Sequence, residues 1–215
     1  MKITIVVDNK KSWFVPYARE IVKRLKKEHR VRLLFDYNKL TRGECAFFLS
    51  CLKIIPKGLL SLNRNNLVIH GSDLPKGRGF SPIPWQILEG RNRIVLTLFE
   101  ADEKLDSGDI YFKEIVNFRG HELLNEIHHK IGEKIVSMVL RFVSEYPNIK
   151  RRKQIGRPTY YPRRTIKDDE LPINKTITQL FNRFRVADSE KYPAYFYYKG
   201  HKYILKIYKN KDKLD

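Results

Sequence analysis

The N-terminal part of the chain carries a strand–helix–strand pattern that leaves few folds open. Residues 2–8 form a β-branched apolar run ending at Asp8, which is typical of a strand buried on both faces. Residues 14–25 repeat apolar side chains at helical spacing after the candidate cap Ser12, and residues 31–35 form a second apolar run. Two strands joined through a helix form the βαβ unit of a parallel sheet.

The alternation of apolar runs and helical periods continues as far as Pro147. Further strands are predicted at residues 46–49, 67–69, 94–99 and 110–118. Helices are predicted at residues 58–62, 81–88, 120–145 and 177–184, the last capped by Asn174 or Thr176, and a hairpin around Gly200 at residues 194–208. We therefore expect an α/β domain with a mostly parallel sheet at residues 1–147. A C-terminal extension with a short helix and a β-hairpin is expected at residues 148–215.

The composition is typical of a folded protein without a membrane span. The chain has 215 residues, of which 42% are hydrophobic, and no apolar stretch reaches the ~20 residues that cross a bilayer. The N-terminal run is too short for a signal peptide and lacks a small-residue cleavage site, so we expect a cytoplasmic protein. Cys45 and Cys51 fit neither a disulfide framework nor a zinc site, which favours buried thiols and no bound metal.

The formal net charge of +19 indicates an anionic partner. The excess is uneven, because eight basic residues lie between Lys150 and Lys167 before the first acid, Asp168. Nucleic acid, a phosphorylated substrate, a polyanionic cofactor and a membrane surface all remain open on charge alone.

Two loop residues offer acid–base chemistry. His70 ends the apolar run at 67–69, and Asp106 lies in the acidic loop that follows residues 94–99. In open α/β sheets, the loops beyond the ends of parallel strands gather at one edge, so we expect the two residues to meet there. Histidine is the side chain best suited to proton transfer near neutral pH. A structural histidine and a plain turn aspartate are the alternatives.

A series of motifs around this pair resembles one enzyme family. The segments are His70-Gly71-Ser72-Asp73-Leu74-Pro75, Gly77-Arg78-Gly79, Pro82, Trp85, Gly90, Thr97 and Leu105-Asp106-Ser107-Gly108-Asp109-Ile110. They resemble the core of the N10-formyltetrahydrofolate-dependent formyltransferases, and the resemblance covers residues 46–112. That family includes methionyl-tRNA formyltransferase, glycinamide ribonucleotide formyltransferase and the sugar N-formyltransferases. The resemblance implies a Rossmann-like sheet with the active site beyond its strand ends.

The resemblance also implies the reaction and the cofactor site. A substrate amine attacks the formyl carbon of N10-formyltetrahydrofolate, and the tetrahedral oxyanion collapses to a formyl amide and tetrahydrofolate. His70 takes a proton from the amine or holds the oxyanion, while Asp106 sets the charge of His70 and helps to relay the proton. The implied pterin site is an apolar wall and a wrapping loop, made by Leu52, Ile54, Ile55, Asp102, Glu103 and Leu105. Ordinary core and a solvated acidic turn are the alternatives.

Val68 departs from the family pattern. The family usually has an asparagine two residues before the histidine, where its amide supports the oxyanion, and this chain has Val68. Asn66 could substitute only through a bend, since a strand rises about 3.3 Å per residue. A backbone N–H or His70 itself is another candidate donor, and loss of activity is the further alternative.

The extension resembles, less specifically, the tails of sugar N-formyltransferases acting on UDP-linked 4-amino-4,6-dideoxy sugars, as in a pseudaminic-acid route. It also resembles the formylation domain of a peptide synthetase. The segments that carry this resemblance are residues 160–165, 168–169, 184–188 and 192–194. The implied sugar-nucleotide site contains Gly77, Arg78, Tyr161, Arg163, Arg164, Arg185 and Tyr192. Arginines can bind phosphates bidentately, and tyrosines can pack on a base or sugar. A solvated basic loop is the alternative.

Other classes of function remain open. The chain is too short for the C-terminal barrel that methionyl-tRNA formyltransferases use on tRNA, so a nucleic-acid substrate is less favoured than a small sugar nucleotide. An aminoacyl-tRNA or a carrier-bound aminoacyl group is nevertheless kept as the alternative acceptor. A non-catalytic folate- or nucleotide-binding protein is kept because of Val68. Residues 195–198 indicate a hairpin core or a homodimer interface.

Overall fold

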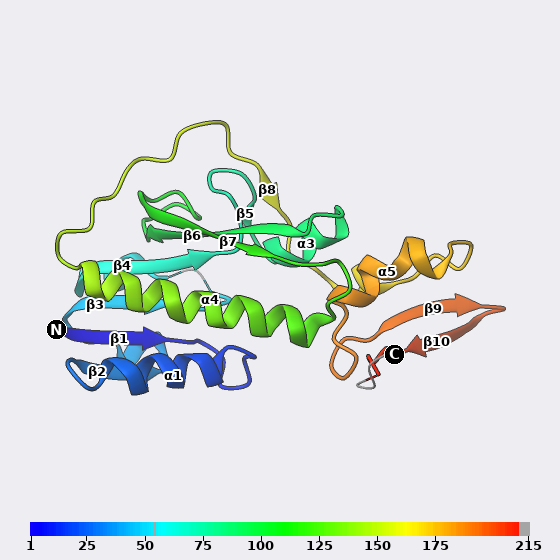
Figure 1. Ribbon diagram of the computed structural model, residues 1–215, viewed down its shortest axis with the longest axis horizontal. Helices are drawn as coiled ribbons and strands as arrows, with labels where there is room; N and C mark the ends of the chain where they lie inside the picture. Colours follow the sequence, from blue (N-terminus) through cyan, green and yellow to red (C-terminus); the bar gives the residue numbers. More distant parts are fainter. Residues whose placement is uncertain (54, 211–215) are drawn as a thin grey trace.

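A six-stranded sheet forms the centre of the protein (Figure 1). The computed structural model describes residues 1–53 and 55–210. In spatial order the strands are β2 (Arg30–Leu34), β1 (Lys2–Val6), β3 (Gly43–Phe48), β4 (Asn63–His70), β6 (Arg93–Glu100) and β7 (Ile110–Asn117). Strands β1 to β4 are parallel, and β6 is antiparallel to both of its neighbours. The predicted mostly parallel α/β fold is confirmed.

The order of the strands places a switch point between β1 and β3. The chain passes from β1 to β2 on one side and then returns to β3 on the other side of β1. Open α/β sheets bind ligands at such a point, just beyond the carboxyl ends of the strands. The loops that follow β1, β3 and β4 meet at this edge.

Alternation along the strands divides the core into two layers. Ile3 and Ile5 pack with α1 (Val15–Leu25) and α4 (Leu124–Glu145), which cover one face of the sheet (Figure 1). Val6 belongs to a smaller cluster on the opposite face. Successive side chains of a strand point to opposite faces, and this explains how both sides of β1 are buried.

The helix α4 begins at Leu124, four residues later than the predicted start at residue 120. The carboxylate of Glu122 accepts hydrogen bonds from the N–H groups of Arg119 and Gly120, which ties these residues into a loop. Glu126 then accepts from the N–H of Leu123 at 2.9 Å and caps the helix. The helix therefore begins at its polar cap and not at the first residue of the apolar pattern.

Shorter elements lie in the connections between the strands. They are η1 (Tyr37–Lys39), α2 (Lys57–Leu60), β5 (Arg78–Gly79) and α3 (Pro82–Leu88). Among the described residues, no helix is both long and apolar enough to span a bilayer.

After α4 the chain runs back across the sheet and then leaves it (Figure 1). Residues 150–161, hereafter the strap, end in β8 (Tyr160–Tyr161), which pairs in parallel with β5. The remaining elements are η2 (Ile166–Asp169), α5 (Ile177–Val186), β9 (Ala194–Tyr198) and β10 (His201–Leu205). The predicted helix and hairpin are both confirmed, and the hydroxyl of Thr176 caps α5 by accepting from the Gln179 N–H.

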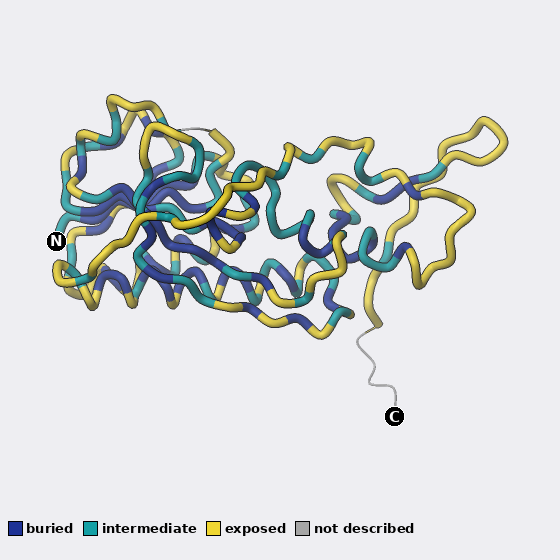
Figure 2. Tube along the Cα trace, turned by 90° about the horizontal axis from the view of Figure 1, so that it is seen from above, coloured by how far each residue is buried: buried dark blue, intermediate teal, exposed yellow. Residues whose placement is uncertain are grey.

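The hairpin projects beyond the body of the molecule. It rests on a small separate core in which Leu180 and Phe184 of α5 pack against Ala194. Every residue of β10 is exposed, and the projecting end of the hairpin is exposed in Figure 2. The side chains of β10 therefore lie on the surface of the protein, and the base of the hairpin joins the small core.

Candidate active site

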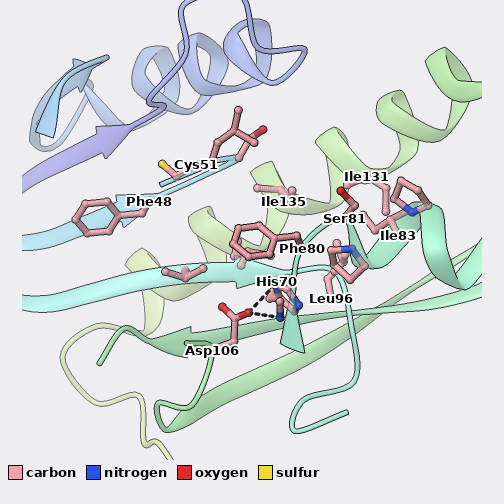
Figure 3. Close-up of a pocket in the computed structure, with 18 of the residues that line it drawn as sticks. Phe48, Cys51, His70, Phe80, Ser81, Ile83, Leu96, Asp106, Ile131 and Ile135 are labelled. Carbon is pink, nitrogen blue, oxygen red and sulfur yellow. Dashed lines mark hydrogen bonds and ion pairs between the residues drawn. The ribbon is translucent and has the colours of Figure 1, made fainter. Parts of the chain in front are cut away.

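A cavity of about 390 Å³ lies at the loop-bearing edge of the sheet (Figure 3). Its wall includes Trp13 after β1, Cys51 after β3, His70 at the end of β4 and Asp106 in the loop after β6. The cavity thus spans from the switch point to the predicted acid–base pair. Most of the remaining wall is apolar, with Phe48 on one side of Phe80 and Ile131 on the other.

His70 is buried, and its position fixes one tautomer. Its Nε2 lies 2.8 Å from the carbonyl oxygen of Gly77. A carbonyl can only accept, so Nε2 carries a hydrogen and donates it. In the neutral imidazole the lone pair is therefore on Nδ1. This atom lies 3.7 Å from Oδ2 of Asp106.

Asp106 reaches His70 by a route different from the one predicted. We expected β6 to run parallel to β4, but the two strands are antiparallel. Thr97 of β6 pairs with His70, and β6 then continues away from His70 until Glu100 pairs with Leu67. The loop of residues 101–109 then turns back to bring Asp106 beside the imidazole. The two residues meet as predicted, but the expectation that both follow parallel strands was wrong.

Asp106 is held in a demanding conformation. Its φ is 50°, in the left-handed region that costs a non-glycine residue about 1 kcal/mol or more. Its Oδ2 accepts a hydrogen bond of 2.9 Å from the N–H of Gly79. The same oxygen faces His70, so one carboxylate joins the loop that follows β4 to the loop that follows β6 (Figure 3).

Gly108 allows the return of the loop. A Cβ at this position would lie 1.7 Å from the carbonyl oxygen of Glu100, a contact that no backbone shift of a few tenths of an ångström relieves. The glycine is therefore required for the loop to fold back against the end of β6. The Asp106 geometry depends on this close approach.

The site can accept and return a proton beside an apolar cavity. Nδ1 of His70 offers a lone pair, and the adjacent carboxylate stabilises the imidazolium that forms on protonation. The Gly77 carbonyl keeps the ring oriented in both states, because it accepts from Nε2 in each. The pair therefore has the parts of a general acid–base catalyst.

Val68 lines the cavity in the position where the resemblance leads one to expect an amide. It precedes His70 by two residues, so both side chains lie on the same face of β4. Asn66 does not replace it, because its Nδ2 donates to the carbonyl oxygen of Leu60 at 2.7 Å. The alternative in which Asn66 supports the oxyanion is therefore wrong.

The predicted cofactor residues divide into three groups. Leu52, Ile55, Asp102 and Leu105 line the cavity. Glu103 instead pairs with Lys57, with 2.7 Å between Oε1 and Nζ. Ile54 lies outside the described residues. Four of the six residues expected from the sequence thus line the cavity, two from the loop after β3 (Leu52 and Ile55) and two from the loop after β6 (Asp102 and Leu105).

The predicted phosphate-binding arginines have very different surroundings. Arg163 lines the cavity and lies over the Phe80 ring at 4.3 Å. Arg164 is held in an ion pair with Asp169. Arg185 is fully buried, where it donates to Asn92 at 2.8 Å and faces Glu122 at 3.7 Å. The structure contradicts a phosphate-binding role for Arg185, because its guanidinium is enclosed by protein.

The other predicted substrate residues are also used within the protein. The Gly77 carbonyl binds His70, and Arg78 donates to Gln154 at 2.7 Å. The Tyr161 hydroxyl donates to Glu89 at 2.9 Å. Tyr192 is 60% exposed and is free to contact a ligand, although it is not part of the cavity wall.

A second histidine, which was not predicted from the sequence, lies in the cavity wall. His128 of α4 stacks on Trp13, with ring centroids 4.1 Å apart and planes 4° apart. Burial lowers the pKa of His128 to about 4, so the ring is neutral at physiological pH. Its helical spacing from Leu124 and Ile131 was a signal that it faces the core side of α4.

Known proteins resemble this chain over most of its length. The family described as formyl transferase matches residues 4–143. A methionyl-tRNA formyltransferase from Caldicellulosiruptor saccharolyticus is 28% identical over 177 residues, covering 81% of this chain and 56% of the relative. The chain thus spans about half the length of the curated relatives it matches.

Solved structures show the same fold. A methionyl-tRNA formyltransferase from Clostridium thermocellum has a TM-score of 0.85 at 24% identity, covering 98% of this chain and 94% of the other. A sugar N-formyltransferase from Shewanella sp. FDAARGOS_354 has a TM-score of 0.75 at 16% identity, with 99% of each chain covered. HypX from Aquifex aeolicus, in complex with tetrahydrofolic acid, has a TM-score of 0.81 at 19% identity, covering 96% of this chain and 37% of HypX.

The matched region contains most of the residues that line the cavity. It includes His70, Asp106 and the loops after β1, β3 and β6, while the strap lies beyond it. The fold, the position of the cavity and the family match agree, and the chain belongs to the formyl transferase family.

Proposed function

We propose that the protein transfers a formyl group from N10-formyltetrahydrofolate to a primary amine. The observation that carries the proposal is the His70–Asp106 pair at the wall of a largely apolar cavity. The cavity suits a folate: Leu52, Ile55 and Leu105 are among the apolar side chains of its wall, and such a wall can pack on the faces of a flat ring system. The HypX structure, which holds tetrahydrofolic acid, supports the same ligand class.

His70 acts in this proposal as the proton carrier. The acceptor amine loses its proton to Nδ1 of His70 as its nitrogen bonds to the formyl carbon. Asp106 stabilises the resulting imidazolium from 3.7 Å. The imidazolium then returns the proton to N10 of the folate as the carbon–nitrogen bond to N10 breaks. The products are a formamide and tetrahydrofolate, and His70 ends in its starting state.

The protonated His70 also supplies a donor for the oxyanion. Val68 has no N–H in its side chain, so it cannot stabilise the negative charge that develops on the formyl oxygen. The Nδ1–H of the imidazolium is formed next to that oxygen at the moment when it is needed. Proton transfer and oxyanion stabilisation therefore fall on one residue.

A sugar nucleotide with a 4-amino-4,6-dideoxy sugar is the acceptor we favour. Arg163 at the cavity wall provides a cation for a phosphate, and exposed Tyr192 offers a ring for a base or sugar. Arg164 and Arg185 are engaged by Asp169 and Glu122, so the phosphate contact rests on Arg163. The structural match to the Shewanella sugar N-formyltransferase over 99% of both chains supports this choice.

An aminoacyl-tRNA is the second candidate acceptor. It is favoured by the curated sequence relatives, which are methionyl-tRNA formyltransferases. The net charge of +19 suits a polyanion. The exposed hairpin adds Tyr197, Tyr198 and Tyr203 next to Lys199 and Lys202, a combination that suits stacking and backbone contacts with nucleic acid.

An acceptor panel tests both candidates. Purified protein is incubated with N10-formyltetrahydrofolate and UDP- or TDP-linked amino sugars in one set, and with methionyl-tRNA in the other. Tetrahydrofolate release and the formylated product are measured together. Transfer to a sugar supports the first candidate, and transfer to methionyl-tRNA supports the second. Folate binding without transfer to any acceptor contradicts the proposed enzyme and favours a binding protein.

A further inference from the structure

The strap fastens both catalytic loops to the same stretch of chain. Arg152 exchanges two backbone hydrogen bonds with Ile110, which follows the Asp106 loop, at 2.7 and 2.9 Å. Further along, the Thr159 carbonyl accepts from the Arg78 N–H, and the Tyr161 carbonyl accepts from the Phe80 N–H. The beginning of the strap thus pairs with the end of the Asp106 loop, and the end of the strap pairs with the loop that follows His70.

Gln154 lies between these two attachments, and its amide binds both loops at once. Nε2 donates to the carbonyl oxygens of Asp106 and Gly108, each at 2.9 Å. Oε1 accepts from the Arg78 guanidinium at 2.7 Å. One side chain therefore fills three hydrogen bonds, two of them to the backbone that carries the catalytic carboxylate.

These contacts determine the position of Oδ2 of Asp106, the atom that faces His70 in the proposed reaction. Asp106 has a left-handed backbone, and its Oδ2 must reach both the Gly79 N–H and Nδ1 of His70. Rotation of the backbone between Asp106 and Gly108 would move that oxygen away from His70. The two carbonyl groups bound by Gln154 flank this segment, so their orientation fixes the direction of the carboxylate.

We propose that Gln154 is a positioning residue for formyl transfer, and that Arg78 acts through it. This inference rests on the proposed function. Gln154 aligns Asp106 with His70 by holding the carbonyl groups on either side of Ser107. Arg78 orients the Gln154 amide so that its N–H groups face these carbonyls. Arg78, predicted from the resemblance to bind substrate, thus contributes to the site without contacting the substrate.

The first test is steady-state kinetics of Gln154→Ala and Gln154→Glu. The Glu variant keeps an acceptor for Arg78 but loses both N–H donors. We expect each variant to lower kcat about 10- to 100-fold, the loss typical of a reacting group displaced by about 1 Å. KM for the folate should change less than about twofold, since the pterin wall is untouched. Equal activity of wild type and both variants would overturn the proposal.

Ile155→Ala is the matched control within the strap. Ile155 is 88% exposed and adjacent to Gln154. We expect this variant to keep the wild-type kcat and KM. A similar loss of kcat in Ile155→Ala would mean that any change in the strap disturbs the site, and it would remove the specific role of Gln154.

A double-mutant cycle tests the role of Arg78. If Arg78 acts through Gln154, Arg78→Met and Gln154→Ala should be non-additive, with the double variant no slower than the slower single variant within about twofold. Losses of kcat that multiply would show that Arg78 acts independently, and this would overturn its assignment.

A spectroscopic measurement separates this proposal from the proposed function. The ¹⁵N chemical shifts of the His70 ring report its tautomer and the surroundings of Nδ1 without any substrate. Gln154→Ala and Gln154→Glu should move the Nδ1 resonance, and Ile155→Ala should leave it in place. If wild type transfers no formyl group but the resonance moves, the proposed function fails while the positioning role stands. An unmoved resonance overturns the positioning role.

Discussion

Two histidines line the same cavity, and the groups that contact their rings differ. His70 has a carbonyl on Nε2 and a carboxylate near Nδ1. His128 instead lies flat against the Trp13 ring, and burial lowers its pKa to about 4. Within the described part of the chain, no hydrogen bond is found for the His128 ring. The first ring can carry a proton, whereas the second acts as a neutral aromatic surface.

A place in the cavity wall therefore does not by itself give a histidine an acid–base role. What distinguishes His70 is that both ring nitrogens have polar neighbours: the Gly77 carbonyl fixes the tautomer at Nε2, and the Asp106 carboxylate lies 3.7 Å from Nδ1. Asp188 favours the charged form of His128, but burial is the larger effect and disfavours charge. Four sets of substitutions test the roles of the two histidines and of the residues near them, beginning with the one for which the largest effect is expected.

His70→Ala should abolish most of the activity. Loss of a general acid–base group typically costs about 10²–10⁴ in rate, and His70 also supplies the proposed oxyanion donor, so we expect about 10³-fold or more in kcat. The measurement is the initial rate of tetrahydrofolate release with the acceptor identified in the panel. His128→Asn, which removes the other ring, should lower kcat less than tenfold, below the loss typical of a missing acid–base group. An equal loss in both variants would contradict the comparison.

The pH dependence of stability should identify His128. Its folded pKa of about 4 lies below the usual value of 6.5 in the unfolded chain, so the unfolded state binds the proton more readily. The contribution to stability is therefore present above pH 6.5 and is lost as the pH falls from 6.5 to about 4. The expected total is at most about 3 kcal/mol.

This slope should disappear in His128→Phe, which keeps a ring against Trp13 but cannot be protonated. Urea denaturation between pH 4 and pH 7 measures it. His129→Phe changes the exposed neighbouring histidine and should keep the wild-type slope. If His128→Phe keeps the slope as well, the neutral surface assigned to His128 is wrong.

Val68→Asn should sharpen the role of His70 as the oxyanion donor. Removal of one such donor from other enzymes costs about 2.7–4 kcal/mol, and an added donor in an unevolved position should recover part of that. We expect kcat to rise about tenfold. Val68→Thr, which keeps the branched shape but has no amide, serves as the control. An unchanged or lower kcat in Val68→Asn would mean that another group already serves the oxyanion.

Arg163→Met should have the smallest effect. Arg163 lies over Phe80 at the cavity wall and donates to the Leu52 carbonyl at 3.2 Å. Loss of its charge should raise KM for a phosphate-bearing acceptor about two- to fivefold, the value of an exposed charged contact, with little change in kcat. Lys167→Met changes another cation of the same basic segment and should leave KM unchanged. A lower kcat without a change in KM would contradict phosphate binding.

Much of the fold was predictable because apolar periods are local. The strand and helix patterns of residues 2–35 and the hairpin around Gly200 need no long-range information. The direction of β6 was not predictable, because an apolar run reads the same in parallel and antiparallel pairing. The start of α4 was missed because the Glu122 carboxylate outweighs the apolar period.

The site was only partly predictable for a similar reason. His70 and Asp106 belong to a continuous set of motifs, and the resemblance placed them correctly next to each other. Arg185 belongs to a basic segment whose sequence says nothing of burial, and its partner Glu122 lies 63 positions earlier. Gln154 has no sequence signal at all, because its role consists of contacts with backbone carbonyls 46 and 48 positions away.

The strap also sets the order in which the site can be completed during synthesis. A ribosome delivers His70 and Asp106 first and the strap only after the whole of α4 has been made. Until then the two catalytic loops lack the chain segment that pairs with both of them. A growing chain can therefore form its sheet and α4 before the contact between His70 and Asp106 is held in place by the strap.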